Sequence, residues 1–376
     1  MTDLGLLAQK LISYPSVTPD QMGCLDYIQD FLENLGFTCT RKKFADVDNL
    51  YARVGTNQPN LCFAGHVDVV PVLHPESWDN DPFSSSLINN YVYGRGAVDM
   101  KGAIAAFMVA IQNRLLKPLN GSISMLLTAD EEGPAEHGTK KMVEWLKDQG
   151  EVIDFCLVGE PTSVSTVGDM IKVGRRGSLN AVVTVTGVAG HVAYPENCVN
   201  PLDILLKFYN RLKQSPLDQG TKDFQPSNLE FTSIDTLNPT SNVIPGSVTA
   251  RLNIRFNTNH TGHKLAEHLK TVAAEISDRI SLDIRISGEA FHNSDHPFAT
   301  HIANCIHTVC GQYPVLSTSG GTSDARFIKD IAPVVELGLC NALAHKDNER
   351  VNLEDLQQLA AIYAHILEAE IYLSMT

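Results

Sequence analysis

Residues 61–70 read LCFAGHVDVV, a short apolar run that ends in a histidine and an aspartate. Near-continuous apolar runs of this length are typical of strands in a sheet that is covered on both faces. Similar runs lie at residues 123–128, 155–158 and 334–337. Stretches with helical periodicity separate them, at residues 3–14, 21–35, 100–116 and 139–149. This alternation predicts an α/β fold built on a mixed, largely parallel sheet covered by helices.

The middle of the chain follows a different pattern. Alternating strands and two helices are expected at residues 179–186, 200–213, 228–236, 246–257, 262–277 and 281–287. The order βαββαβ is typical of a ferredoxin-like α+β domain. Because an apolar run lies beyond this part, we expect a discontinuous first domain, 1–176 and 292–376, with 177–291 inserted. A chain of 376 residues is also longer than one hydrophobic core usually serves.

Charge and cysteine usage exclude several classes of protein. The formal net charge is -14 with a pI near 5.3, so neither nucleic acid nor an anionic membrane surface is expected as a partner. The eight cysteines contain no C-x-x-C pair, which favours reduced thiols. No apolar run approaches ~20 residues and no basic leader opens the chain. We therefore expect a soluble, cytoplasmic protein.

Potential metal ligands follow the apolar runs. In chain order they are His66, the pair Glu131-Glu132, Glu160 and His345. Open α/β sheets bind their ligands at the carboxyl ends of the strands, so these side chains are expected to converge. Each has an ordinary alternative when taken singly, since adjacent acids are common on solvated loops. Together they predict a metal-dependent hydrolase.

Asp99 lies in the glycine-containing segment YGRGAVDMKG, residues 93–102. A carboxylate can bridge two cations ~3.5 to 4 Å apart, and two histidines with three carboxylates can hold such a pair. One glutamate is then left to move a proton. The alternative for Asp99 is a helix N-cap. We also expect the carboxylate of Asp68 to hydrogen-bond the ring nitrogen that His66 does not offer to a metal.

The segments that carry these residues resemble the M20 family of dizinc amidohydrolases and peptidases. The matching segments, in order, are 65–68, 93–102, 130–132, 159–161 and His345. Four others, 174–178, 190–195, 241–245 and 320–324, most resemble the desuccinylases of that family, and the likeness runs nearly end to end. The resemblance implies a zinc-peptidase-like catalytic domain with an inserted lid and dimerisation domain.

By this resemblance, His66 and Glu160 hold one zinc, Glu132 and His345 hold the other, and Asp99 bridges them. Glu131 is then the general acid and base. Imidazole and carboxylate ligands also suit cobalt or manganese, so zinc rests on the likeness. The resemblance further implies a homodimer in which His191 of the inserted domain serves the partner subunit and stabilises the oxyanion. The alternative for His191 is an exposed loop histidine.

The substrate that the resemblance implies is N-succinyl-L,L-2,6-diaminopimelate, a small anion with three carboxylates. Its hydrolysis would yield succinate and L,L-diaminopimelate for lysine synthesis. Substrate carboxylates need arginines in so acidic a chain. The candidate substrate-binding residues are Arg175 or Arg176, Arg255 and Arg326, with Tyr194, Asn242, Gly321, Ser323 and Asn341 as hydrogen-bond partners. For each arginine, a surface charge is the alternative.

Other functions use the same scaffold. A deacetylase of N-acetylornithine would use the same metal chemistry on a smaller acyl group, and a carboxypeptidase or aminoacylase would take peptide-like substrates. The paired Arg175-Arg176 favours the more anionic succinyl substrate. A binding protein without catalysis has no reason to keep five ligands and Glu131.

Overall fold

The structure, a computed structural model, describes residues 3–368. These residues form two compact units. The first comprises the chain up to Gly174, Asn293–Ser317 and the chain from Ser323 onward, and the second comprises Arg175–His292 with Thr318–Thr322. Residues 1–2 and 369–376, which the expected first domain includes, lie outside the described residues.

The first unit contains an eight-stranded sheet in the order β1-β2-β6-β3-β7-β18-β8-β17. The strands are β1 (Thr38–Phe44), β2 (Val47–Val54), β6 (Ser122–Thr128), β3 (Asn60–His66), β7 (Phe155–Val158), β18 (Val334–Glu336), β8 (Met170–Lys172) and β17 (Val315–Ser317). The neighbours β6, β3, β7 and β18 are parallel, whereas β1, β2 and β6 are joined antiparallel. The predicted mixed α/β fold is confirmed.

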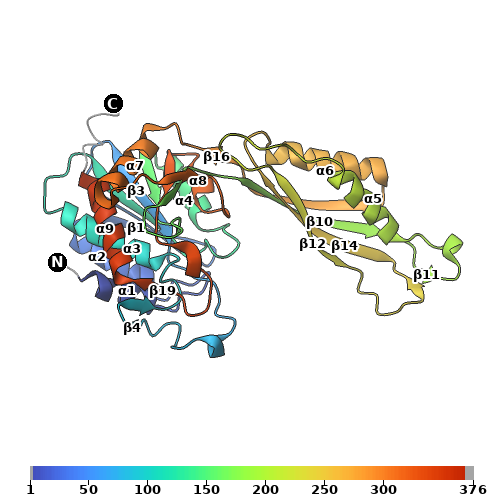
Figure 1. Cartoon of the computed structure of the whole chain (residues 1–376), viewed down its shortest axis with the longest axis horizontal. Helices are drawn as coiled ribbons and strands as arrows, with labels where there is room; N and C mark the ends of the chain where they lie inside the picture. Colours follow the sequence, from blue (N-terminus) through green and yellow to red (C-terminus); the bar gives the residue numbers. More distant parts are fainter. Residues whose placement is uncertain (1–2, 369–376) are drawn as a thin grey trace. The chain divides into compact units, whose positions relative to one another are not determined.

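Helices cover both faces of this sheet (Figure 1). The helices are α1 (Leu4–Ile12), α2 (Cys24–Asn34), α3 (Lys101–Arg114), α4 (Thr139–Asp148), α7 (Pro297–Cys310), α8 (Ala325–Ile328) and α9 (Leu353–Glu368). Helix α3 packs against α9 and α1, and α7 packs against α9. Helices α4 and α8 pack together and contact β6 and β18 respectively. A small sheet of β4 (Leu87–Ile88), β5 (Tyr91–Tyr93) and β19 (Arg350–Asn352) completes the unit.

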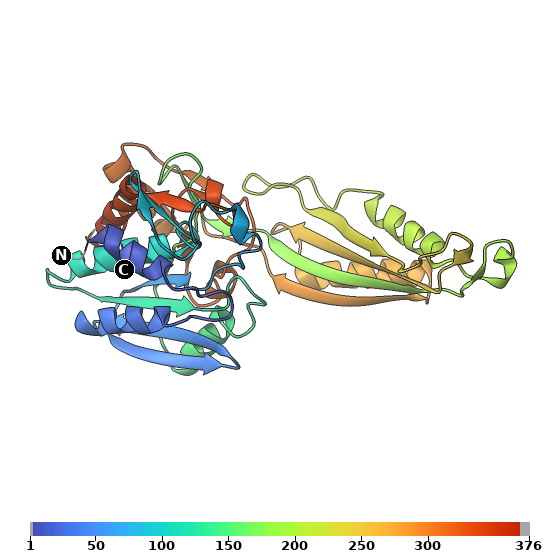
Figure 2. The same cartoon turned by 90° about the horizontal axis from the view of Figure 1, so that it is seen from below.

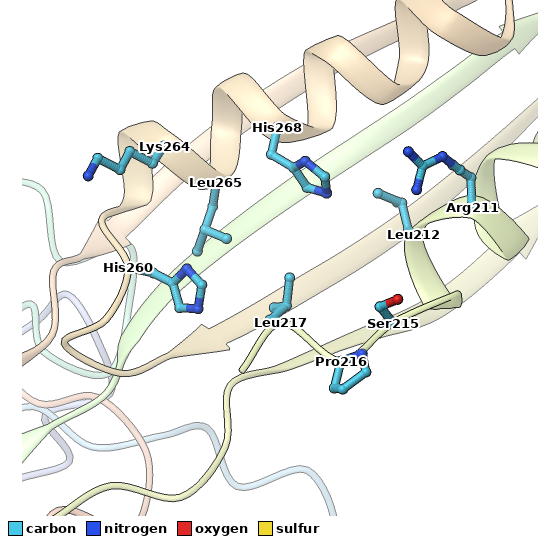
Figure 3. Close-up of a pocket in the computed structure, with 9 residues that line it drawn as sticks. All are labelled: Arg211, Leu212, Ser215, Pro216, Leu217, His260, Lys264, Leu265 and His268. Atoms are coloured by element: carbon cyan, nitrogen blue, oxygen red, sulfur yellow. The ribbon is translucent and has the colours of Figure 1, made fainter. Parts of the chain in front are cut away.

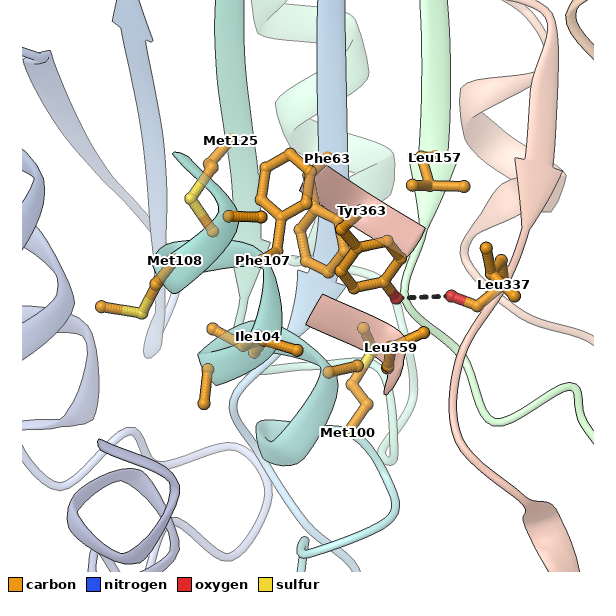
Figure 4. Packing of buried hydrophobic residues seen from close by; sticks show 14 of the residues in the cluster. Phe63, Met100, Ile104, Phe107, Met108, Met125, Leu157, Leu337, Leu359 and Tyr363 are labelled. Atoms are coloured by element: carbon orange, nitrogen blue, oxygen red, sulfur yellow. Dashed lines mark hydrogen bonds between the residues drawn. The ribbon is translucent and has the colours of Figure 1, made fainter. Parts of the chain in front are cut away.

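An aromatic cluster ties β3 to the helices above it (Figure 4). The rings of Phe63 and Phe107 stack with centroids 4.2 Å apart, and Tyr363 meets both rings edge-on. The buried Tyr363 hydroxyl donates to the carbonyl of Leu337 at 2.6 Å. Replacing one such phenylalanine by alanine typically costs about 3 to 5 kcal/mol of stability. The cluster therefore fixes β3, the strand that ends at His66, against helices α3 and α9.

The second unit is a four-stranded antiparallel sheet in the order β12-β14-β10-β15. Its main elements are β10 (Gly177–Thr186), α5 (Pro201–Lys213), β12 (Asn228–Asp235), β14 (Ser247–Phe256), α6 (Gly262–Ile276) and β15 (Ile280–Gly288). Figure 2 shows both helices on one side of these strands. Alternate residues of β14 are buried against the helices, as a sheet with one covered face requires. The predicted βαββαβ order is confirmed.

Short elements complete the described chain. They are β9 (Gly174–Arg175), paired with β16 (Phe291–His292), β11 (Gly190–His191), paired with β13 (Val243–Ile244), and the 3-10 helices η1 (Pro75–Ser77), η2 (Pro195–Asn197) and η3 (Asn341–Leu343). Among residues 3–368, no helix has the length and apolar character needed to cross a bilayer.

Residues 318–322 belong to the second unit, whereas the sequence placed them in the first. The buried Arg175 guanidinium donates from Nη1 to the carbonyls of Ser319 and Gly321, at 3.3 and 3.2 Å. The hydroxyl of Thr318 donates to the carbonyl of Asp223. These bonds attach the segment to the second unit by backbone carbonyls, which sequence periodicity does not reveal.

Candidate metal centre

Four adjacent parallel strands, β6, β3, β7 and β18, deliver four of the five candidate ligands to one edge of the sheet, and the fifth, Asp99, lies just before α3. His66 is the last residue of β3, the Glu131-Glu132 pair follows β6, and Glu160 follows β7. His345 lies after β18, beyond the turn formed by η3. Because parallel strands end at the same edge, residues distant in sequence meet there.

Asp99 lies at the centre of the group. Its Oδ1 is 3.1 Å from Nε2 of His66, and its Oδ2 is 3.2 Å from Nε2 of His345. Nε2 of His66 is also 3.8 Å from Oε1 of Glu160, and Nε2 of His345 is 2.7 Å from Oε1 of Glu132. In each contact both atoms are potential metal ligands. With a cation bound, each atom would contact the cation instead of the neighbouring ligand.

Two sets of three ligands share the Asp99 carboxylate. In one set, atoms of His66, Asp99 and Glu160 lie within 4.8 Å of one another, and in the other the same holds for Asp99, Glu132 and His345. The division matches the one that the family resemblance implies. A shared carboxylate between two imidazole-containing sets is an arrangement that suits a pair of divalent cations.

The carboxylates of this group are buried close to one another, so each negative charge is repelled by its neighbours. Burial, followed by the charges of Asp99 and Glu131, raises the pKa of Glu160 well above its usual range. Burial favours a neutral His66, but the bond and charge of Asp99 raise the pKa of that histidine well above normal. Hydrogen bonds that the His345 ring donates to Asp99 and Glu132 raise the pKa of this histidine to about 10. Carboxylates crowded at low dielectric beside imidazoles fit the ligand set of divalent cations.

Glu131 lies next to these sets and shares a group with His66 and Glu132. Burial, followed by the charge of Asp324, raises its pKa well above the usual range. A carboxyl group with a raised pKa can hold a proton at neutral pH and release it again. Asp324 is itself buried, and its role beside Glu131 was missed in the sequence, where it reads as one acid in a glycine-rich loop.

The expected bond between the Asp68 carboxylate and the His66 ring is wrong. Nδ1 of His66 bonds the backbone carbonyl of Asp68 at 2.9 Å, while the nearest carboxylate oxygen is 3.7 Å away. Instead, the carboxylate accepts the backbone N–H groups of Glu131 and Glu132, each at 3.1 Å. Strand β3 ends at His66, so the two-residue alternation that the expectation used no longer applies at Asp68.

Asp130 is a second acid that the sequence did not single out. Its carboxylate accepts N–H groups of Ala135, Glu136 and His137 at 2.9 to 3.2 Å. These bonds fix the loop that follows Glu132. The available signal was its position immediately before the glutamate pair.

Three candidate residues of the second unit lie close together. His191 on β11 pairs with Val243 on β13, and its ring centroid is 5.8 Å from that of Tyr194. The backbone carbonyl of Asn242 accepts the N–H of Val192 at 3.0 Å. All three candidates, His191, Tyr194 and Asn242, are exposed. The structure thus gathers them on one pair of loops.

The two adjacent arginines have different environments. Arg175 is buried and holds the 318–322 segment, which includes Gly321. Arg176 is half-buried and donates to Oδ1 of Asn228 at 3.0 Å. Arg255, also half-buried, donates from Nε to Oδ1 of Asn253 at 3.0 Å. Because Asn253 lies on the same strand, β14, this bond fixes the orientation of the Arg255 guanidinium relative to the sheet.

The remaining candidates lie in the first unit. Ser323 is buried and its hydroxyl donates to Oε1 of Glu336 at 2.8 Å. Arg326 lies 4.0 Å from the carboxylate of Asp324, and Asn341 is exposed at the start of η3. The Ser323 hydroxyl proton is therefore already donated to Glu336, so toward a substrate this hydroxyl could act as an acceptor.

A pocket of about 290 Å³ lies elsewhere, between α5, α6 and the loop at 215–217 (Figure 3). Figure 3 shows the side chains of His260, His268 and Arg211 around it. Nε2 of His260 already bonds the carboxylate of Asp218 at 2.9 Å. None of the candidate ligands lines this pocket, so it does not contribute to the metal centre.

Known proteins resemble the chain along nearly its whole length. A succinyl-diaminopimelate desuccinylase of Phenylobacterium zucineum is 50% identical over 366 residues, covering 96% of each chain. One of Rhodospirillum centenum is 52% identical over 369 residues, covering 96% of each chain.

Solved structures share the fold. An M20 family metallo-carboxypeptidase of Sulfolobus solfataricus superposes with a TM-score of 0.82 at 18% identity, covering 98% of this chain and 99% of the other. A dinuclear metal-binding M20 peptidase of Bacillus subtilis gives a TM-score of 0.73 at 15% identity, covering 97% of this chain and 96% of the other.

Residues 62–369 match the sequence profile described as peptidase family M20/M25/M40. This span contains every candidate metal ligand, all of the second unit and most of the first. The chain belongs to the M20 family.

Proposed function

We propose that the protein hydrolyses N-succinyl-L,L-2,6-diaminopimelate to succinate and L,L-diaminopimelate, a step in lysine and diaminopimelate synthesis. The observation that carries the proposal is the near full-length identity of about 50% to proteins named succinyl-diaminopimelate desuccinylase. The two ligand sets that share Asp99 support the hydrolytic chemistry.

His66 and Glu160 would hold one divalent cation, Glu132 and His345 a second, and Asp99 both. When bound, two such cations lower the pKa of a water molecule and polarise the amide carbonyl. We propose zinc, because imidazole and carboxylate ligands suit it, and cobalt or manganese would be accepted by the same set.

Glu131 is the proposed general base and acid. Burial, followed by the charge of Asp324, raises the pKa of this carboxyl group, which makes its carboxylate a stronger base toward the proton of the attacking water. The same carboxyl then gives the proton to the departing amine as the carbon–nitrogen bond breaks. Asp68 holds the backbone of Glu131 in place through the hydrogen bond described above.

Arginine side chains are proposed to bind the substrate carboxylates. Arg255 is favoured because the bond from its Nε to Asn253 orients the half-buried guanidinium, and a guanidinium is suited to charge-assisted bonds with carboxylates. Arg176 is favoured over Arg175, which is buried against the 318–322 segment. Arg326 is proposed for a further carboxylate, and the hydrogen-bond partners are Tyr194, Asn242, Gly321, Ser323 and Asn341.

His191 is proposed to act in a homodimer formed through the second unit. In this arrangement its ring donates to the carbonyl oxygen as negative charge develops there, an interaction typically worth ~2.7 to 4 kcal/mol. The exposure of His191 on its loop supports contact with another subunit. We place the homodimer in the cytoplasm, in keeping with the acidic chain and its free cysteines.

One comparison of substrates tests the proposal. Succinate release from N-succinyl-L,L-diaminopimelate is measured beside acetate release from N-acetylornithine, with metal removed and with zinc restored. We expect zinc-dependent release of succinate and at least 100-fold lower kcat/KM for the acetyl compound. A preference for N-acetylornithine, or hydrolysis that survives complete metal removal, would contradict the proposal.

A further inference from the structure

Glu349 is a buried acid four residues beyond His345, and no role in the reaction described above uses it. The residue has 0% of its surface exposed. Its Oε2 accepts from Nη1 of Arg95 at 2.9 Å and from the N–H of Gly96 at 3.0 Å. Its Oε1 accepts from the N–H groups of Val98 and Asp99 at 2.8 and 3.2 Å. Four donors from residues 95–99 therefore converge on one carboxylate.

These bonds extend a strand pairing into an irregular segment. Strands β5 and β19 pair antiparallel as far as Tyr93 and Arg350. The next bond joins the N–H of Gly94 to the carbonyl of Glu349 at 2.9 Å. Beyond it the backbone leaves the extended conformation, with Gly96 at φ +86°. There the Glu349 side chain accepts the N–H groups that no strand partner takes.

The same pair of segments carries two proposed metal ligands. Asp99 ends the segment that Glu349 holds, and His345 opens the segment that contains Glu349. Arg95 strengthens the connection, because its Nη1 also donates to the carbonyl of Lys346 at 3.2 Å. His345 has a left-handed backbone with φ +62°, a conformation that surrounding structure must stabilise.

We propose that Glu349 is a positioning residue that fixes the Asp99 carboxylate relative to His345 and so sets the geometry of the shared metal centre. The inference rests on the proposed function, because it assumes that these residues bind cations. Groups that orient metal ligands commonly change metal affinity 10- to 100-fold when they are removed. Glu349 acts on the backbone of Asp99, and it touches neither substrate nor metal.

The test measures zinc affinity separately from stability. Metal-free full-length protein is titrated with zinc against a chelator of known affinity, and unfolding of the metal-free protein by urea is followed in parallel. We expect Glu349→Gln to weaken zinc binding about 10- to 100-fold, because an amide presents donors to Arg95 and Gly96. We also expect altered visible absorption of the cobalt-loaded variant, which reports ligand geometry.

Two further variants separate positioning from simple support of the fold. Glu151→Gln removes the half-buried partner of Arg53, and we expect it to lower stability while zinc affinity stays within twofold. The double variant R95M/E349M removes both members of the buried pair and so leaves no unpaired buried charge, yet the N–H groups of Gly96, Val98 and Asp99 lose their acceptor. We therefore expect the double variant to be more stable than a variant in which Glu349 alone becomes methionine, without recovering zinc affinity, and it carries the test if Glu349→Gln does not fold.

The outcomes distinguish the inference from the function on which it rests. If wild type binds two zinc ions and releases succinate while both Glu349 variants bind zinc as wild type does, only the inference is overturned. Recovery of affinity together with stability in R95M/E349M would also overturn it. If wild type binds fewer than two zinc ions, the proposed function fails and the inference fails with it.

Discussion

Oδ2 of Asp99 lies 3.2 Å from Nε2 of His345, and its other carboxylate oxygen faces His66. Asp99 comes just before α3, whereas His345 lies near the end of the first unit. The parallel strands and the Glu349 bonds bring these distant segments together. From this relationship follow a shared ligand for two cations and an adjacent glutamate that can move a proton.

The first prediction concerns the general base. Glu131→Gln should lower kcat about 10²- to 10⁴-fold, because an amide cannot accept the proton of the attacking water. Zinc content should stay at the wild-type value, since Glu131 lies outside both ligand sets that contain Asp99. Steady-state kinetics and metal analysis check both statements.

Glu136→Gln on the same loop is the matched control, because Glu136 is exposed and belongs to neither ligand set that shares Asp99. We expect its kinetics to match wild type. Near-normal turnover by Glu131→Gln would remove Glu131 from its assigned role.

The second prediction concerns catalysis across a dimer. His191→Ala and Glu131→Gln subunits are each expected to be nearly inactive alone. In a mixed dimer, one active site combines an intact Glu131 with the intact His191 of the other subunit. Activity should therefore recover when the two variants are mixed, to about a quarter of wild type for random exchange.

Formation of mixed dimers has to be verified, for example with a tag on one variant. Verified mixed dimers that show no recovery would mean that His191 does not act in the partner's site.

The third prediction concerns substrate recognition by Arg255. Arg255→Met should lower kcat/KM for the succinyl substrate about 10- to 100-fold, because a charge-assisted bond is worth roughly 1.5 to 3 kcal/mol. Most of the loss should appear in KM. Arg251→Met is the control, since Arg251 lies on the same face of β14 but is more exposed.

Arg255→Lys should recover little of the loss, because an ammonium group cannot reproduce the planar fork of donors. Equal losses from Arg251→Met and Arg255→Met would indicate a general effect of charge and would refute a specific contact.

The fourth prediction concerns stability in acid. Burial, followed by the charge of His365, lowers the pKa of His301 from 6.5 to about 4. Between these values the unfolded chain binds more protons than the folded chain, so the free energy of unfolding falls as the pH drops through that window. Solvent screening at this partly exposed ring limits the contribution to about 2 kcal/mol.

Urea unfolding of metal-free protein between pH 4 and 7 measures the effect. His301→Gln should flatten the pH dependence relative to wild type, and His307→Gln, an exposed histidine on the same helix, should leave it unchanged. Identical slopes for wild type and His301→Gln would contradict the assigned shift.

The sequence was informative where a side chain follows directly from strand geometry. His66, Glu132 and Glu160 come at or just after apolar strands, and the rule that parallel strands end at one edge was enough to expect their convergence. The βαββαβ order of the second unit followed from periodicity alone. The burial of a strand and the alternation of apolar and polar residues along it can be predicted from the local sequence.

Features that depend on backbone acceptors and irregular loops were not predictable in the same way. Asp68 supports the backbone of Glu131 instead of the His66 ring, and residues 318–322 join the second unit through Arg175. The partner of Glu349 is a run of N–H groups, which has no signature in side-chain identity. Its only sequence signal is an acid four residues after His345.

The central claim is that two cations share Asp99. Anomalous diffraction at the zinc absorption edge from crystals of the zinc-loaded protein tests it most directly. We predict two peaks per subunit, ~3.5 to 4 Å apart, one beside His66 and Glu160 and the other beside Glu132 and His345, with Asp99 between them. A single peak, or two peaks that do not share the Asp99 carboxylate, would contradict the account.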